Sequence, residues 1–214
     1  MITTVDVETS WQKTDTGGYD PSPFHPDNIL VSVGINDEYY FTNHSERVDE
    51  GCYHKIQSIL DKTTLLIGHN IKFDLMWLLE SGFKYTGRVY DTMLGEYILN
   101  RGIRKSLTLE MSCRRRKIGS KDSAIKEWTD RGIPFQDIPA DVVEEYGKID
   151  VAITRKLFDS QMNDLKMAKN KGLLMTLKMM NEFLVVLSDM ERNGININLE
   201  ELHSVEKEYR AEFA

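Results

Sequence analysis

Four acidic residues from three well-separated segments constrain this chain more than any other feature of its sequence. Asp6 and Glu8 lie in the otherwise apolar opening segment, Asp74 lies in the middle of the chain, and Asp150 follows Tyr146 by four residues. Only a fold can bring these side chains together. A converged cluster of carboxylate oxygens is the ligand set that hard divalent cations such as Mg²⁺ prefer. The pattern therefore points to metal-dependent chemistry on phosphodiesters.

The opening segment, residues 2–9, is predicted to be a β-strand because it alternates and is rich in β-branched residues. Side chains alternate between the faces of a strand, so Asp6 and Glu8 point to the same side. Acids occupy 34 of the 214 positions, and this spacing should occur about five times by chance. The spacing alone is weak support. The apolar context strengthens it, because a pair of carboxylates there is costly unless a cation compensates it.

The remaining patterns predict an α/β domain with a mixed central sheet flanked by helices and a helical extension at the C-terminal end. Short β-rich runs predict a hairpin at 29–35 and 39–42 and a buried strand at 64–68. A segment rich in Gly and Pro, residues 11–28, is predicted to be a loop. Helices are predicted at residues 49–61, 70–82, 92–99, 107–116, 140–169 and 173–192, with a last one beginning at 199.

Two of these helices carry the remaining acids. Asn70 is expected to cap the helix at 70–82, which places Asp74 about one turn inside it, near its positively polarised end. In the helix at 140–169, Tyr146 and Asp150 are four residues apart and therefore share one face.

The charge of the chain is unevenly distributed. Its net charge of -7 argues against a nucleic-acid partner, because phosphates are normally bound by Lys and Arg. However, residues 1–50 hold ten acids and two bases, a net charge of -8, whereas residues 101–131 hold ten bases and four acids, a net charge of +6. The basic run at 114–117 fits either phosphate contacts or a helix end whose dipole favours cations. The asymmetry suits a protein that holds nucleotides through metal ions at one place and through Lys and Arg side chains at another.

The cysteines and the N-terminus indicate a cytoplasmic protein. Cys52 and Cys113 lack any C-x-x-C spacing, so we expect two ordinary thiols and neither a disulfide nor a zinc site. The first residues carry no basic signal region, and no apolar run reaches the roughly 18 to 20 residues that span a bilayer. We therefore expect no membrane partner.

Three sequence blocks resemble the motifs of the DEDD exonuclease superfamily, in its tyrosine-containing subgroup, over roughly residues 1–165. They are Asp6-x-Glu8, Gly68-His69-Asn70-x-x-Phe73-Asp74 and Tyr146-x-x-x-Asp150. Residues 90–99, YDTMLGEYIL, are similar to the helix after the second motif in proofreading domains of family A DNA polymerases. Residues 181–195 are similar to the segment that joins the proofreading and polymerase domains of that family.

The resemblance implies a ribonuclease H-like fold with a 3'-5' exonuclease domain at residues 1–170 and the truncated start of a polymerase region at 171–214. The substrate would be a single-stranded or frayed DNA 3' end, with a polymerase domain in cis. Because the chain begins at the catalytic strand, we expect no upstream 5' nuclease. This arrangement is more similar to that of viral replicative polymerases than to that of bacterial DNA polymerase I. The expected context is viral or bacterial DNA replication.

The resemblance also implies two Mg²⁺ ions, for which Mn²⁺ can substitute. Asp6 would bridge both ions, Glu8 and Asp150 would complete the site of the water-activating ion, and Asp74 would hold the second. Two ions so placed can clamp an in-line displacement at phosphorus. Tyr146 would orient the attacking water rather than take its proton, since a phenol with a pKa near 10 is a poor base at neutral pH.

Four residues are candidates for contacts to the terminal nucleotides: Thr9, Trp11, Asn70 and Phe73. Trp11 lies in a polar loop directly after the acidic strand, and aromatic faces bind unstacked bases without sequence preference. Phe73 also fits the hydrophobic core, and Asn70 also fits a helix cap.

Two further polar residues lie near the second motif. His69 is expected to be a structural loop residue. Asp91 is either a fifth acid near the metals or the cap of the helix that begins at Thr92.

Two alternative functions remain open from the sequence. One is an exoribonuclease similar to ribonuclease D, which a contact to the sugar 2'-hydroxyl would indicate. The other is a non-catalytic DNA-binding scaffold. The complete set of acids and the tyrosine count against a scaffold, because binding alone does not require them.

Overall fold

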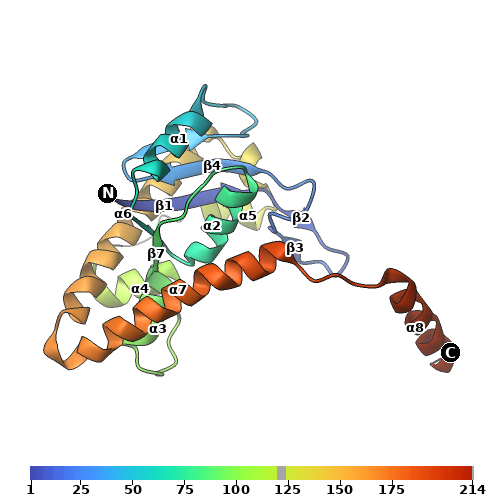
Figure 1. The fold of residues 1–214 in the computed structure, drawn as a ribbon. Helices are drawn as coiled ribbons and strands as arrows, with labels where there is room; N and C mark the ends of the chain where they lie inside the picture. The colour runs from blue at the N-terminus through green and yellow to red at the C-terminus, as the bar shows by residue number, and fades with distance from the viewer. Residues whose placement is uncertain (120–123, 214) are drawn as a thin grey trace.

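The computed structural model describes residues 1–119 and 124–213, and its centre is a five-stranded mixed sheet (Figure 1). In spatial order the strands are β5 (Glu38–Phe41), β4 (Leu30–Ile35), β1 (Ile2–Thr9), β6 (Leu65–Gly68) and β7 (Arg88–Asp91). β1 pairs antiparallel with β4 and parallel with β6, while β5 and β7 form the edges. The predicted α/β architecture with a mixed sheet is confirmed.

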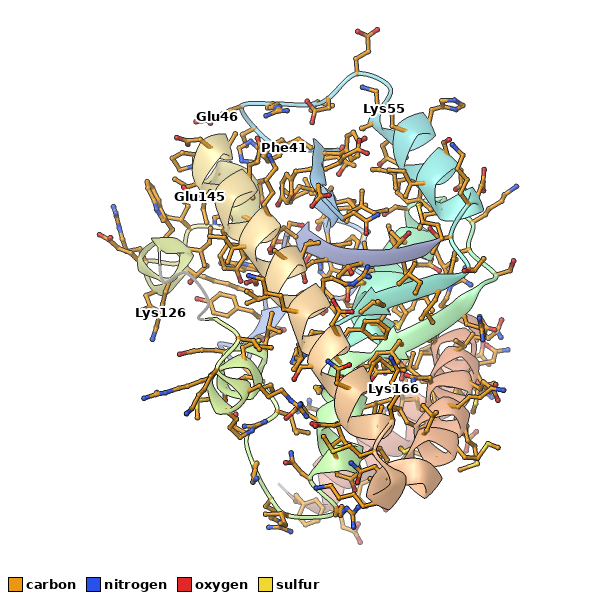
Figure 2. All side chains as sticks on the ribbon, turned by 90° about the vertical axis from the view of Figure 1, so that its left-hand side faces the viewer. Phe41, Glu46, Lys55, Lys126, Glu145 and Lys166 are labelled. Carbon is orange, nitrogen blue, oxygen red and sulfur yellow. The ribbon has the colours of Figure 1, made fainter. Side chains whose placement is uncertain are left out.

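Helices flank this sheet and extend the chain beyond it. They are α1 (Cys52–Asp61), α2 (Ile71–Glu80), α3 (Thr92–Leu99), α4 (Leu109–Arg116), α5 (Ala124–Asp130), α6 (Ala140–Leu165), α7 (Lys171–Asn193) and α8 (Leu199–Glu212). Figure 2 shows α6 crossing one face of the sheet diagonally, with α1 on the other side of the strands. α8 lies away from the rest of the protein in Figure 1, and none of its residues is buried.

The two faces of β1 meet different parts of the core. Val5 and Val7 are buried in the cluster that includes Leu75 and Leu78 of α2, where each fully buried aliphatic side chain contributes roughly 1.5 to 3 kcal/mol. Because strand residues alternate, Asp6 and Glu8 point to the opposite face. That face is covered by α6. The hydrophobic pattern of β1 therefore fixes which helix its acids meet.

The strand bounds largely agree with the sequence predictions. β1 covers the predicted residues, and Asn36, with φ of 54°, lies at the turn of the predicted hairpin. The sequence predictions missed β7, whose four residues are too few to show a periodicity, and they also missed α5. The predicted loop at 11–28 contains two paired two-residue strands, β2 (Gln12–Lys13) and β3 (Tyr19–Asp20).

Some helix bounds required correction. The long helix predicted to reach residue 169 ends at Leu165, and a short 3₁₀ turn covers Ala168–Asn170. α4 starts at Leu109 rather than at 107, because Thr108 caps it by accepting a hydrogen bond from the Met111 N–H. Within the described ranges, no helix combines the length and apolar character that a membrane crossing requires.

α6 approaches the sheet closely where glycines face neighbouring side chains. A Cβ at Gly147 would lie 2.3 Å from a ring carbon of Tyr39, and one at Gly34 would lie 2.8 Å from a methyl carbon of Val151. The Tyr39 ring is also held by a 2.8 Å hydrogen bond between its hydroxyl and the Ser32 hydroxyl. Gly147 directly follows Tyr146, so this contact sets how near the helix brings Tyr146 to β1.

We expect Gly147→Ala to destabilise the protein by about 1 to 3 kcal/mol, as overpacking of a well-packed core does. Alanine would gain up to about 1 kcal/mol of helix propensity, but the Tyr39 ring would have to move and leave Ser32. Gly172 lies in a helix with nothing within 4 Å of its added Cβ, so Gly172→Ala is the matched control. Urea denaturation measures both, and equal stability of the two variants would contradict the packing argument.

Candidate active site

Tyr146 and Asp150 of α6 meet the acids of β1. The hydroxyl of Tyr146 donates a hydrogen bond to the carboxylate of Asp150 one turn further along the helix, and both side chains are buried. Burial raises the pKa of Tyr146 well above its ordinary value, and the negative charges of Glu8, Asp150 and Asp6 raise it further. Tyr146 therefore remains protonated at neutral pH. It can donate a hydrogen bond but cannot act as a base.

Asp74 reaches the same place from α2. Its side chain is 3% exposed, and its Oδ1 accepts a 3.0 Å hydrogen bond from the backbone N–H of Val7, between the two acids of β1. Burial raises the pKa of Asp74 well above its ordinary value, and the charge of Asp6 is the next largest cause. The structure thus places Asp6 near enough to act on both Asp74 and Tyr146, and it places Glu8 and Asp150 near Tyr146.

The chemistry of this cluster fits divalent cations. The described residues contain no group of three or more His, Cys, Asp or Glu already arranged around a metal position. However, the largest charge effects on Asp74 and Tyr146 come from acids, and they act in a buried environment. Carboxylates crowded in this way favour their neutral forms unless a cation offsets them. Hard oxygen ligands with excess negative charge are suited to Mg²⁺ or Mn²⁺.

The candidate substrate-binding residues differ in their exposure. Trp11 is half-buried, and its ring packs edge-on against Tyr19 with the ring centroids 4.1 Å apart. Phe73 is half-buried against the main core cluster and contacts Trp77. Thr9 is 7% exposed and lies at a register shift of the sheet directly after Glu8. Trp11 and Phe73 thus keep some accessible surface, whereas Thr9 keeps little.

The prediction that the Asn70 side chain caps α2 is wrong. Asn70 occupies the capping position but has a left-handed conformation, φ 64°, and its side chain makes no capping hydrogen bond. Side-chain capping normally requires an extended conformation at this position, whereas asparagine tolerates the left-handed region. The residue is exposed. Its side chain is therefore accessible from solvent beside the acidic cluster.

Asp91 is the cap predicted for α3, and it has a second structural role. Its Oδ1 accepts hydrogen bonds from the backbone N–H of Met93, at 2.7 Å, and of Leu94, at 3.4 Å. The same oxygen accepts the backbone N–H of Asn70 at 3.0 Å. Its charge also contributes to the raised pKa of Asp74. Asp91 is thus a cap that also belongs to the electrostatic surroundings of the cluster.

His69 is a structural loop residue, as expected. One ring nitrogen bonds the Thr92 hydroxyl at 2.9 Å, and the other bonds the Leu107 carbonyl at 2.8 Å. These contacts tie the end of β6 to the start of α3 and to the loop before α4.

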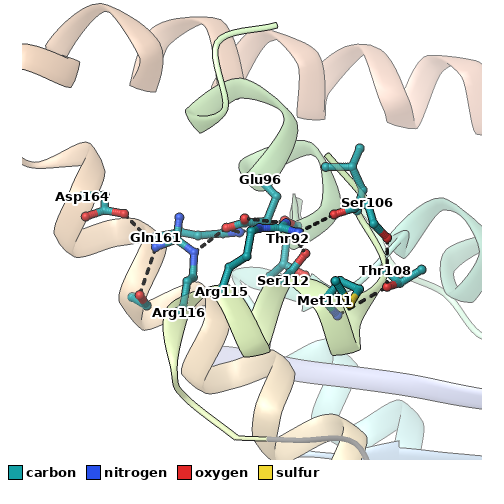
Figure 3. Close-up of polar contacts among 12 residues, drawn as sticks. Thr92, Glu96, Ser106, Thr108, Met111, Ser112, Arg115, Arg116, Gln161 and Asp164 are labelled. Carbon is teal, nitrogen blue, oxygen red and sulfur yellow. Dashed lines mark hydrogen bonds and ion pairs between the residues drawn. The ribbon is translucent and has the colours of Figure 1, made fainter. Parts of the chain in front are cut away.

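Two arginines of the basic run form ion pairs with carboxylates of the same chain (Figure 3). Arg115 and Arg116 both pair with Glu96, which is 2% exposed, and Arg116 also pairs with Asp164 at 2.7 Å. The phosphate-binding interpretation is therefore wrong for these two residues. They join α4 to α3 and α6.

Sequence reasoning missed Tyr39 as a neighbour of the cluster. Burial raises the pKa of the Tyr39 hydroxyl, and the charges of Glu8 and Asp6 add to the effect. The sequence carries no signal for this, because Tyr39 comes near these acids only through the pairing of β5 with β4, the strand that lies between β5 and β1.

Comparison with known proteins places the chain in a family. The family model described as 3'-5' exonuclease, of the DNA polymerase A type, matches residues 14–166. DNA polymerase I of Borreliella burgdorferi is 27% identical over 148 residues, which make up 69% of this chain but only 16% of that polymerase. The expected likeness to viral polymerases gains no support from this bacterial relative.

Solved structures agree on the fold. Brucella melitensis NrnC with bound Mg²⁺ matches with a TM-score of 0.62 at 18% identity, covering 90% of this chain and 86% of that chain. The POL domain of Pol1 from M. smegmatis, in complex with DNA primer-template and dNTP, matches with a TM-score of 0.67 at 16% identity, covering 97% and 31%. These likenesses confirm the ribonuclease H-like architecture. Since the family model covers most of its length, the chain belongs to the 3'-5' exonuclease family of family A DNA polymerases, a family of nucleases.

Proposed function

We propose that this chain removes nucleotides from DNA 3' ends, with Asp6, Glu8, Asp74 and Asp150 as the metal ligands. One observation carries the proposal: acids from β1, α2 and α6 lie near enough to act on the same groups. The charge of Asp6 adds to the raised pKa of buried Asp74, and the charges of Glu8, Asp150 and Asp6 add to that of Tyr146. A binding surface alone gains nothing from such a costly cluster. The family match, which covers Asp74 and Asp150, supports nuclease chemistry.

The proposed cofactor is a pair of Mg²⁺ ions, with Mn²⁺ as a substitute. Asp6, Glu8, Asp74 and Asp150 are the residues that would hold these ions. When bound, such ions lower the pKa of a water molecule and stabilise the charge on the departing oxygen. The bound Mg²⁺ of Brucella melitensis NrnC supports the choice of metal.

Tyr146 and the candidate substrate residues would then position the reactants. The protonated hydroxyl of Tyr146 can orient a water molecule through a hydrogen bond. Trp11 and Phe73 offer aromatic surface to an unstacked terminal base, and exposed Asn70 offers an amide. Thr9 can reach a nucleotide only through its small exposed part. The substrate is a single-stranded or frayed end, since duplex must open before its last nucleotide enters such a site.

The proposal includes a polymerase domain in cis. Residues 1–170 form the exonuclease domain in this proposal, and residues 171–214 begin the polymerase region. The relative from Borreliella burgdorferi is named DNA polymerase I and is much longer than the region it shares with this chain, which supports the assignment and a bacterial replication context.

A 5'-labelled single strand, offered as DNA or as RNA and with Mg²⁺ or with chelator, tests the proposed function. We expect a ladder of 3'-shortened DNA that requires the metal, with release of nucleoside monophosphates. Equal degradation of RNA would favour the ribonuclease D-like alternative. Intact DNA in the presence of Mg²⁺, combined with measurable DNA binding, would instead favour a non-catalytic scaffold.

Tyr146→Phe is expected to lower the rate of cleavage about tenfold. This is a smaller loss than that from replacing any proposed metal ligand, because a hydroxyl that orients a water molecule contributes less to the rate than a residue that holds the metal. Loss of the hydroxyl also removes the bond to Asp150. Single-turnover kinetics on the same labelled strand measure the effect. If the variant lost as much activity as Asp6→Ala, the positioning role of Tyr146 would be wrong.

A further inference from the structure

α7 lies beyond residues 14–166, which the family model matches, yet it packs on the elements that position the acidic cluster. It contacts β7, α3 and α2, and Figure 1 shows it running along this side of the sheet. The helix therefore packs directly on the elements of the exonuclease fold, although the proposed polymerase region begins with it. Its contacts to β7 and α2 include polar ones.

A buried hydrogen bond connects α7 to Asp91. The Oδ1 of Asn181 accepts the backbone N–H of Asp91 at 3.0 Å, and the two residues are 5% and 1% exposed. Asn181 lines a largely apolar pocket together with Val89, Phe158 and Leu177. Such a site provides few other acceptors for the Asp91 N–H.

Asp91, whose backbone is held by Asn181, is in turn hydrogen-bonded to the residue before α2. Its carboxylate accepts the backbone N–H of Asn70, the left-handed residue directly before the helix. Asp74 lies in the first turn of that helix and is bonded in turn to the backbone of Val7. Each link from Asn181 to Asp74 is thus a hydrogen bond or a stretch of rigid helix.

Two ion pairs keep α7 alongside α2. Lys72, in the first turn of α2, pairs with Glu191 at 2.5 Å, and Glu80, at its last turn, pairs with Arg192 at 2.7 Å. Both pairs are partly exposed, so each contributes little to stability by itself. Their placement at both ends of α2 nevertheless restricts how that helix can rotate or slide.

We propose that Asn181 is a positioning residue for the metal ligand Asp74, acting through Asp91 and the left-handed turn at Asn70. This proposal rests on the proposed function of the cluster. Without an acceptor at position 181, the Asp91 N–H would be buried and unsatisfied, which proteins avoid by moving the backbone. Movement of Asp91 displaces the Asn70 N–H that it holds, and Asp74 moves with the start of α2. Residues supporting metal ligands in this way typically change metal affinity or activity by about 10- to 100-fold.

The test compares Asn181→Leu with Asn181→Asp. Leucine has a similar volume but no acceptor, whereas aspartate keeps an oxygen for the Asp91 N–H. We expect the apparent Mn²⁺ dissociation constant of Asn181→Leu, measured by calorimetry without DNA, to rise about tenfold. Its kcat should fall about as much while KM stays near the wild-type value. Asn181→Asp should remain closer to wild type in both Mn²⁺ affinity and kcat.

A purely structural role for Asn181 predicts the opposite ranking of the two variants, which thermal stability measures. If Asn181 served only to pack α7, leucine would be tolerated in this apolar environment and aspartate would be the damaging change. Leu177→Ala is the matched control: Leu177 is a buried residue of the same helix, in a cluster with Tyr90 but without a hydrogen bond to Asp91. It should lower the melting temperature and leave Mn²⁺ affinity unchanged. Should Asn181→Leu fail to fold, Asn181→Ala is expected to weaken Mn²⁺ binding in the same direction.

Two results would overturn the positioning role. In the first, Asn181→Leu has the same Mn²⁺ affinity and kcat as Leu177→Ala. If Asn181→Leu does not fold, Asn181→Ala takes its place in this comparison. The other is better Mn²⁺ binding and kcat in Asn181→Leu than in Asn181→Asp. Failure of the proposed function is distinguishable, because the wild-type protein itself would then neither bind Mn²⁺ nor shorten DNA.

Discussion

Asp74→Asn is expected to abolish metal-dependent cleavage while making the metal-free protein more stable at neutral pH. Asparagine keeps an Oδ1 acceptor for the Val7 N–H but removes a negative charge that is buried close to Asp6. The activity should fall by more than about a hundredfold, since replacing a metal ligand exceeds the effect of replacing the residues around it.

The pH dependence follows from the raised pKa of Asp74 in the metal-free fold. The folded state holds this proton more tightly than the unfolded state, so the group stabilises the fold at pH values below its ordinary pKa of 3.8. That stabilisation is lost as the pH rises from 3.8 through the raised value. Above this window the ionised carboxylate opposes folding, and its replacement by asparagine removes the opposition.

Thermal melts from pH 4 to pH 8, with chelator or with Mg²⁺, measure both effects. Wild-type protein should lose stability with rising pH more steeply than the variant in chelator, and it should gain more from Mg²⁺ at pH 8. Glu145→Gln is the control, because Glu145 is an exposed acid on α6. A variant that melted below wild type in chelator at pH 8, or that kept its cleavage rate, would refute the role of Asp74.

Glu96→Ala is expected to cause the largest loss of stability without loss of the catalytic groups. Glu96 is buried and pairs with Arg115 and Arg116, whose side chains are 23% and 14% exposed. Removing one member of a buried ion pair leaves charge without its partner and costs about 3 to 5 kcal/mol. We expect the lower end, about 3 kcal/mol, because Arg116 keeps Asp164. The melting temperature should fall by about 6 to 12 °C for a chain of this size.

Asp164→Ala is the matched comparison, since it removes the other partner of the same guanidinium. The Asp164 side chain is 36% exposed, so its loss should cost no more than about 1 kcal/mol. Urea denaturation of the two variants ranks the two contacts. Equal losses would show that burial does not decide the strength of this network. Cleavage at 25 °C should stay near the wild-type rate in both, because neither residue belongs to the proposed site.

The sequence was sufficient to predict the centre of the fold and the elements that carry the acids of the proposed site. β1 could be predicted because its alternating, β-branched sequence indicates a strand, and a strand places Asp6 and Glu8 on the same face. The spacing of Tyr146 and Asp150 is equally local, since four residues are about one helical turn. Each of these inferences depends on neighbours within one element.

The parts that the sequence did not predict depend on contacts between elements. Asn70 fits a helix cap by residue type, but the Asp91 carboxylate holds it in a left-handed conformation that prevents capping. Nothing in the basic run predicts that two of its arginines form ion pairs with Glu96, about twenty residues earlier. Asn181 is one of many polar residues of α7, and only the packing of α7 on β7 gives it the Asp91 N–H as a partner.

Crystals soaked in Mn²⁺ give the most direct test of the central claim. The account predicts anomalous density for Mn²⁺ among the carboxylates of Asp6, Glu8, Asp74 and Asp150, with the Tyr146 hydroxyl beside it. The number of peaks tests the proposed pair of ions. Carboxylates that remain apart, with no Mn²⁺ between them at saturating concentration, would contradict the account.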